Sequence, residues 1–206
     1  EMIDDWNTSA AWRREVTGQD WWTRRICGGL ASYWVYQHLG NLSPQELADN
    51  TTWQAVQEHW DDAEPALQAM AEAADRDPRS VRWSYVRHWG EARMIVIDSR
   101  AGRVLDESAR AMLDDDEFTW VEAAMRRAVD EGVEHLVLGT SLPWLLPHAI
   151  HQLERWNETL VRRHLGRPFG WVSEQLRQAA DLEHWAAFGD SFERLGRALV
   201  TLGRGE

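Results

Sequence analysis

The sequence predicts an α/β fold, in the form of a helix-rich segment with a few strands. Three observations predict it. Residues 10–80 carry helical apolar stripes and helix-capping residues. Near residue 81 apolar and polar residues begin to alternate, as they do in a half-buried strand. From residue 92 onward strand, helix, strand and helix follow one another, which is the βαβ pattern of a parallel sheet.

Helices are expected first. Asn7, Thr8 and Ser9 offer N-caps for a first helix, and a longer helix is expected from about Trp21 to Leu39. The Gly28-Gly29 pair inside this helix lowers helix propensity, and close approach of another backbone would explain it.

Two more helices are expected before residue 80. The phrase Ser43–Glu46 combines a capping box with proline at the first helical position, and an apolar stripe continues from it to Trp60. The acidic residues 61–64 begin another helix, which stops before Pro78.

Strands are expected in the second half. Residues 81–86 alternate, and Gly90 makes a turn after them. The continuous apolar run Met94–Ile97 predicts a strand buried on both faces, and Leu136–Leu138 predicts a second buried strand. Between these two strands, residues 114–132 predict a helix with an acidic start and a glycine at its end. The remaining helices are expected at 147–166, 173–188 and 192–202.

Composition excludes several classes of protein. The chain has 206 residues, with 34 acidic against 22 basic side chains and a net charge of −12, which argues against nucleic-acid binding. All the basic residues are arginine, so lysine Schiff-base chemistry is excluded. The single cysteine, Cys27, excludes an intrachain disulfide and a cysteine-based zinc cluster. No apolar run approaches the ~18 residues of a membrane span.

Polar side chains follow both predicted parallel strands, at the point where each strand ends. Asp98-Ser99-Arg100 follows the first, and Gly139-Thr140-Ser141 follows the second. Ligands of open α/β sheets gather beyond the carboxyl ends of the strands, so we expect these two tips to lie side by side. Two interpretations of Asp98 and Arg100 stay open. They either bind phosphate, with the arginine fork on its oxygens, or form a strand-end turn with the aspartate as a local cap.

Two further clusters could hold a metal ion. Asp4, Asp5 and Asn7 are oxygen ligands of the kind that hard cations favour, although their spacing favours the alternative, capping of the first helix. His148 and His151, three residues apart with Glu154 following, could face one metal or line a polar helix face. A nucleophilic role for Ser141 lacks both the Gly-x-Ser-x-Gly elbow and a paired base.

Tryptophan occurs 14 times. The tryptophans could form an aromatic platform for a sugar or a flat ligand. Six of them sit at core spacing on the expected helices, which favours burial. These are Trp22, Trp34, Trp53, Trp60, Trp120 and Trp156.

Five segments of the sequence carry a family resemblance, namely Glu1–Ser9, residues 32–44, Val96–Arg100, Leu138–Trp144 and Leu182–Phe188. Taken together, they resemble PhoD-like (alkaline phosphatase D) metallophosphatases. Glu1–Ser9 resembles the stretch that follows the family's Asp-Asp-His-Glu metal motif, and residues 32–44 look like a helical insertion of a bacterial branch. Val96–Arg100 is similar to the family's strand ending in Asp-Ser/Thr-Arg, and Leu138–Trp144 to its next strand end. Leu182–Phe188 looks like the helix before the last metal motif.

The resemblance implies a fold and an activity. The fold would be part of a calcineurin-like metallophosphatase sandwich, in which residues 1–80 form a helical region or insertion and residues 81–206 belong to the phosphatase domain. The activity would be hydrolysis of small phosphate mono- or diesters by metal-bound hydroxide, with calcium, iron, manganese or zinc as the divalent or mixed metal ions.

The family's main metal motifs are missing, apart from Glu1 as a remnant of one. We therefore expect this chain to be the central segment of such an enzyme, binding no metal and turning over no substrate by itself. The resemblance carries over seven residues. Arg100 and Asp98 would be catalytic, Thr140, Ser141 and Asn7 would bind substrate, and Asp4 and Asp5 would lie at the metal edge.

Two alternatives from other classes stay open. One is a binding module with a tryptophan-lined cleft, and the other is a helical interaction module that self-associates through an apolar patch. No membrane or nucleic-acid partner is expected in either case. The compartment is left open, with a slight preference for the cytoplasm.

Overall fold

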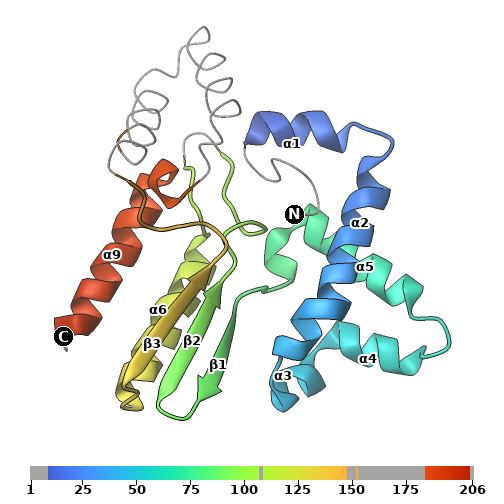
Figure 1. Cartoon of the computed structure of the whole chain (residues 1–206). Coiled ribbons are helices and arrows are strands. Elements are labelled where there is room, and N and C mark those ends of the chain that lie inside the picture. Colours follow the sequence, from blue (N-terminus) through green and yellow to red (C-terminus); the bar gives the residue numbers. More distant parts are fainter. Residues whose placement is uncertain (1–8, 107–108, 148–151, 153–183, 205–206) are drawn as a thin grey trace, which may run out of the picture.

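The computed structural model describes residues 9–106, 109–147, 152 and 184–204 (Figure 1). It is mixed helix and strand, as expected. Helices α1 to α5 form one part of the molecule, and a three-stranded sheet with the order β1-β2-β3 forms the other. Helix α6 packs on one face of this sheet, and α9 packs against α6.

The expected long helix is present and changes type near its end. After α1 (Ala10–Thr17), capped by Ser9, α2 spans Trp22–Tyr33. It continues as a π-helical turn, Trp34–His38, and a short 3₁₀ turn. A Cβ placed on Gly28 would have no atom within 4 Å, so the expected close approach at this glycine was wrong.

The helix expected from residue 44 to residue 60 is two helices. The Ser43 capping box begins α3 (Pro44–Asp49), as predicted. Asn50 then ends α3 and caps α4 (Thr51–Glu58), because its side chain accepts a hydrogen bond from Trp53 N at 2.8 Å. Trp60 lies beyond the end of α4 and is 74% exposed, so its predicted burial was wrong.

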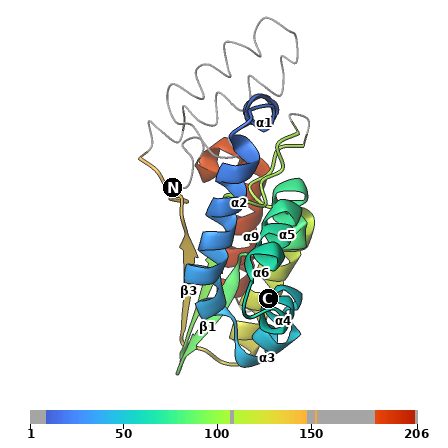
Figure 2. The same ribbon diagram turned by 90° about the vertical axis from the view of Figure 1, so that its right-hand side faces the viewer.

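The helical part has its own hydrophobic core. Helix α5 (Glu64–Arg76) lies along α2, as Figure 2 shows. The Trp22 indole Nε1 donates to Asp75 Oδ2 at 3.1 Å, and Arg13 pairs with the same carboxylate at 2.7 Å. The main buried side chains are Trp12, Trp22, Ile26, Leu30, Trp34, Met70, Ala71 and Trp83.

The first strand lies further along the chain than its alternation predicts. β1 spans Tyr85–Trp89 and pairs antiparallel with β2 (Ala92–Ile97). Gly90 forms the hairpin turn with a φ of +56°, as expected. The predicted strand at 81–86 was wrong at its start, because Trp83 is buried in the helical core and not in the sheet.

The predicted βαβ unit is confirmed. Helix α6 (Asp115–Asp130) begins at Asp114, whose side chain accepts from Glu117 N at 2.8 Å. After α6, β3 (His135–Thr140) pairs parallel to β2. The helix expected to run to Phe188 was wrong at this end, because Trp185–Ala187 is a short 3₁₀ turn (η4) followed by α9 (Gly189–Arg204). Most of that expected helix lies outside the described residues.

Burial of the sheet is one-sided. Ile95 and Ile97 of β2 are buried in a second core with α6 and η4. Met94 and Val96 point to the other face and are only half-buried, and Val137 of β3 is 48% exposed. The expectation of strands buried on both faces was therefore wrong, because the described part of the chain covers a single face of the sheet.

His38 generates a prediction about stability and pH. Its ring is buried against Trp83 with centroids 5.1 Å apart, and Nδ1 has no hydrogen-bond partner among the described residues. Burial lowers the pKa of His38 below its ordinary 6.5, and Glu46 opposes this shift only in part. The unfolded chain therefore takes up a proton below about pH 6.5 before the native state does, so stability falls as pH drops through that window.

We expect His38→Phe, which keeps the ring contact, to lose less stability than the wild type between pH 7 and the native pKa. Urea denaturation at several pH values measures this difference. The control for loss of a histidine as such is His59→Gln, because His59 is exposed and its substitution should change stability at pH 7 by no more than about 0.5 kcal/mol. Parallel pH slopes for His38→Phe and the wild type would contradict the prediction.

Candidate functional site

The two polar strand ends meet, as the sequence predicts. Ser99, after β2, places its Oγ 2.7 Å from Ser141 Oγ, after β3. Thr140 Oγ1 donates a hydrogen bond to the same Ser99 Oγ at 3.1 Å. The cause is the parallel register, in which Ile97 lies opposite Thr140, so both strands end at one edge of the sheet.

Asp98 holds the first strand-end loop together. Its Oδ1 accepts from Arg100 N at 2.9 Å and from Ala101 N at 3.0 Å, and its Oδ2 accepts from Gly102 N at 3.2 Å. Burial raises the pKa of Asp98, and the three backbone hydrogen bonds offset that rise only in part. These contacts match the local-cap interpretation, and Arg100 therefore contributes to the loop through its backbone N–H.

A buried arginine, Arg103, also holds this loop, and the sequence analysis did not single it out. Arg103 Nε donates to the Ser99 carbonyl oxygen at 2.8 Å. Arg103 and Arg110 are each 5% exposed, and their guanidinium carbons lie 5.5 and 4.7 Å from the centre of the Phe188 ring. No local pattern marks this cluster, because its three residues are spread from position 103 to position 188 of the chain.

Trp185 is a further contact that sequence reasoning missed. Its ring is fully buried, and its indole Nε1 donates to Thr140 Oγ1 at 3.1 Å. The nearest signal was the phrase Leu182–Phe188, which entered only through the family resemblance. A tryptophan 45 positions from its partner gives no periodic signal that would link the two.

Several predicted site residues fall outside the described residues. They are Asp4, Asp5, Asn7, His148, His151 and Glu154. Within the ranges that the structure describes, no group of three or more histidine, cysteine, aspartate and glutamate side chains could hold a metal ion. In the same ranges, no helix combines the length and apolar character needed to cross a membrane.

A cavity of about 590 Å³ lies between the N-termini of α6 and α9, apart from the strand ends. Its walls carry both signs of charge. Arg194 pairs there with Asp115 at 2.9 Å and with Glu122 at 2.8 Å. Because this arginine is already neutralised by protein carboxylates, it adds little net attraction for an anion in the cavity.

A scan against protein-family models, a search of curated proteins and a search of solved structures each found no match for this chain.

The Asp98 contacts generate a stability prediction. Asp98→Ala leaves three backbone N–H groups without their acceptor, so we expect it to lower the free energy of unfolding by about 1–3 kcal/mol. Asp98→Asn keeps one acceptor oxygen and should lose less. Urea denaturation at pH 7 measures both changes.

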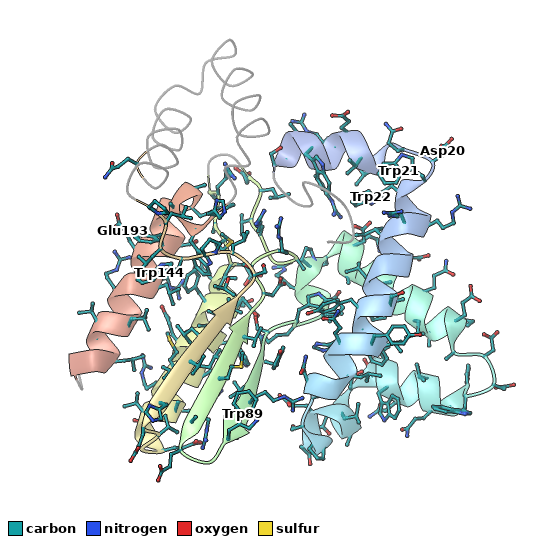
Figure 3. The ribbon with its side chains drawn as sticks, viewed as in Figure 1. Asp20, Trp21, Trp22, Trp89, Trp144 and Glu193 are labelled. Carbon is teal, nitrogen blue, oxygen red and sulfur yellow. The ribbon has the colours of Figure 1, made fainter. Side chains whose placement is uncertain are left out.

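Asp20→Ala is the matched control, because Asp20 is exposed at the corner between α1 and α2 (Figure 3). It should change stability by no more than about 0.5 kcal/mol. Wild-type stability in Asp98→Ala would show that the strand-end loop does not depend on this cap.

Proposed function

We propose that this chain is a segment of a metal-dependent phosphatase or phosphodiesterase of the PhoD-like, calcineurin-like type, acting on small phosphate esters. The observation that carries the proposal is the contact between the two strand ends. Ser99 Oγ and Ser141 Oγ lie 2.7 Å apart, so the phrases that resemble the family's strand ends meet where the parallel strands β2 and β3 end. Ligand sites of α/β sheets form at such strand ends.

The open face of the sheet supports the sandwich part of the proposal. Met94, Val96 and Val137 share the face opposite α6, and outward residues of a solvent-facing sheet are usually polar. No helix or strand of the described part of the chain lies over this face in Figure 1, where α6 lies behind the sheet. A second sheet packed about 10 Å away would bury these side chains.

The residues at the sheet edge have separate roles in this proposal. Arg100 offers a planar fork that fits two phosphoryl oxygens and neutralises charge that develops on them. Asp98 fixes the loop on which Arg100 stands, through the three backbone N–H groups that it accepts from. Thr140 and Ser141 supply hydroxyl groups beside that loop.

In this proposal, the metal ions are bound by other parts of the longer enzyme and not by the described residues. The described residues do not fit a metal centre, because the one carboxylate at the sheet edge, Asp98, is taken up by backbone N–H groups. We therefore assign calcium, iron, manganese or zinc to ligands beyond these residues and derive no catalytic step through a metal held by them.

The tryptophan-lined binding module has less support. Among the residues that the structure describes, three tryptophans are well exposed, namely Trp21 at 43%, Trp60 at 74% and Trp89 at 61%. They stand on separate elements, and Figure 3 shows Trp21 at the α1–α2 corner and Trp89 at the far end of β1. Trp21 meets Trp22 edge-on at 63°, whereas a platform for a flat ligand needs parallel rings.

The role of Arg100 can be tested in the longer protein that contains this segment. We expect it to hydrolyse a chromogenic phosphate ester and to lose activity with a chelator. Arg100→Ala should lower kcat by about tenfold or more while stability changes little, since the arginine acts on the developing charge.

The control for this experiment is Arg127→Ala, because Arg127 is exposed in the last turn of α6, at the opposite end of the sheet. Its kinetics should match those of the wild type. Unchanged turnover in Arg100→Ala would remove this arginine from the site.

The open sheet face gives a second test. Val137→Thr should change the stability of the 206-residue chain by no more than about 0.5 kcal/mol, because Val137 is 48% exposed there. In the longer protein the same change should cost about 1–3 kcal/mol, because a buried hydroxyl replaces a methyl group.

Val129→Thr is the matched control, since Val129 is 43% exposed on α6 and should be neutral in both proteins. Equal effects of Val137→Thr in the two proteins would argue against a covering sheet. A concentration-dependent dimer of the 206-residue chain that Val137→Thr weakens would instead favour the self-associating module.

A further inference from the structure

Four polar groups at the sheet edge form one continuous chain of hydrogen bonds. The buried Trp185 Nε1 donates to Thr140 Oγ1 at 3.1 Å, Thr140 Oγ1 donates to Ser99 Oγ at 3.1 Å, and Ser99 Oγ lies 2.7 Å from Ser141 Oγ. The chain begins in the core beneath the sheet and ends at an exposed side chain.

The direction of this chain follows from what each group can do. An indole N–H only donates, so Thr140 Oγ1 must accept from Trp185. Thr140 then gives its single proton to Ser99. Ser99 is 1% exposed and has no other acceptor among the described residues, so leaving its proton unbonded would cost about 1–3 kcal/mol. Ser99 therefore donates to Ser141.

The hydroxyl proton of Ser141 is then available to a further hydrogen-bond acceptor. Ser141 accepts from Ser99, and no acceptor for its hydroxyl lies among the described residues. Each hydroxyl that accepts a hydrogen bond becomes a better donor, so the chain strengthens the Ser141 O–H as a donor. Because these hydrogen bonds all point toward Ser141, none of the four groups can accept the Ser141 proton. The Ser141 oxygen is therefore a poor nucleophile.

We propose that Trp185 sets the direction of this chain so that the Ser141 hydroxyl donates to an oxygen of a bound tetrahedral oxyanion. The choice of a phosphoryl oxygen as that oxyanion rests on the proposed function. Trp185 is a positioning residue, because it acts through Thr140 and Ser99 and touches no ligand. Ser141 is the group that contacts the ligand.

The test is a titration of the 206-residue chain with inorganic phosphate, and separately with sulfate, followed by ¹H–¹⁵N NMR. We expect saturable shifts at the Trp185 indole N–H and at the backbone amides of residues 139–142. Ser141→Ala should weaken binding by about tenfold or more, the usual effect of losing a hydrogen bond to a charged group. Ser141→Thr keeps the hydroxyl and should retain most of the affinity.

Trp185→Phe keeps the buried ring and removes the donor, so it should weaken binding as much as Ser141→Ala does. The double variant should bind no more weakly than Ser141→Ala alone, because Trp185 acts on the ligand only through the Ser141 hydroxyl. Trp144→Phe is the matched control, since its buried indole Nε1 has no partner among the described residues. Wild-type affinity in Ser141→Ala, no shift at residues 139–142, or an equal loss in Trp144→Phe would overturn the proposal.

The two proposals fail in different ways. If phosphate and sulfate bind through Ser141 while the longer protein hydrolyses no phosphate ester, the hydroxyl donor stands and the hydrolase does not. If the longer protein hydrolyses phosphate esters and Ser141→Ala leaves both its kcat and its KM unchanged, the hydrolase stands and the donor role of Ser141 fails.

Discussion

The parallel pairing of β2 with β3 is the constraint on which the rest of the structure depends. Helix α6 carries the chain back along the sheet, so Ile97 and Thr140 end side by side. Without that register, the Ser99 and Ser141 hydroxyls, which are 42 positions apart in sequence, would not meet at 2.7 Å. A slip of one residue would reverse the two faces of a strand, moving Ile95 out of the core. The apolar core and the polar edge are thus fixed by one register.

The sequence predicts local features well where a single side chain decides the geometry. The Ser43 box, the Asp114 cap and the Gly90 turn are such features, because each depends on neighbours within four residues. The sequence-based prediction fails where contact with a residue far away in the sequence determines how a side chain packs. Trp83 follows a strand-like alternation but packs with Tyr33, their ring centroids 5.4 Å apart. Trp185 reaches Thr140 from another part of the chain, and no periodicity encodes that contact.

The one-sided burial of the sheet joins the fold to the proposed function. A three-stranded sheet that buries Ile95 and Ile97 against α6 can remain folded with its other face in water. A sheet face that stays in water usually carries polar residues, yet Met94, Val96 and Val137 on this face are apolar. The helical part does not bury these three side chains. Its own core forms around α2 and α5, and it meets the sheet at β1. The apolar composition of this face is what the second sheet of the proposed sandwich would account for.

The chemistry of the edge is consistent with an anion in spite of the acidic chain. A charged aspartate beside an oxyanion would repel it, but both carboxylate oxygens of Asp98 accept hydrogen bonds from backbone N–H groups, whose dipoles offset part of its negative charge. Burial raises the pKa of Asp98, whereas these three hydrogen bonds act in the opposite direction by stabilising the carboxylate. The Asp98 side chain is then a structural group that shapes the loop. In the proposed site, the favourable contacts with an anion would come from Arg100 and from the proton of Ser141, both of which stand on the loops that the parallel strands bring together.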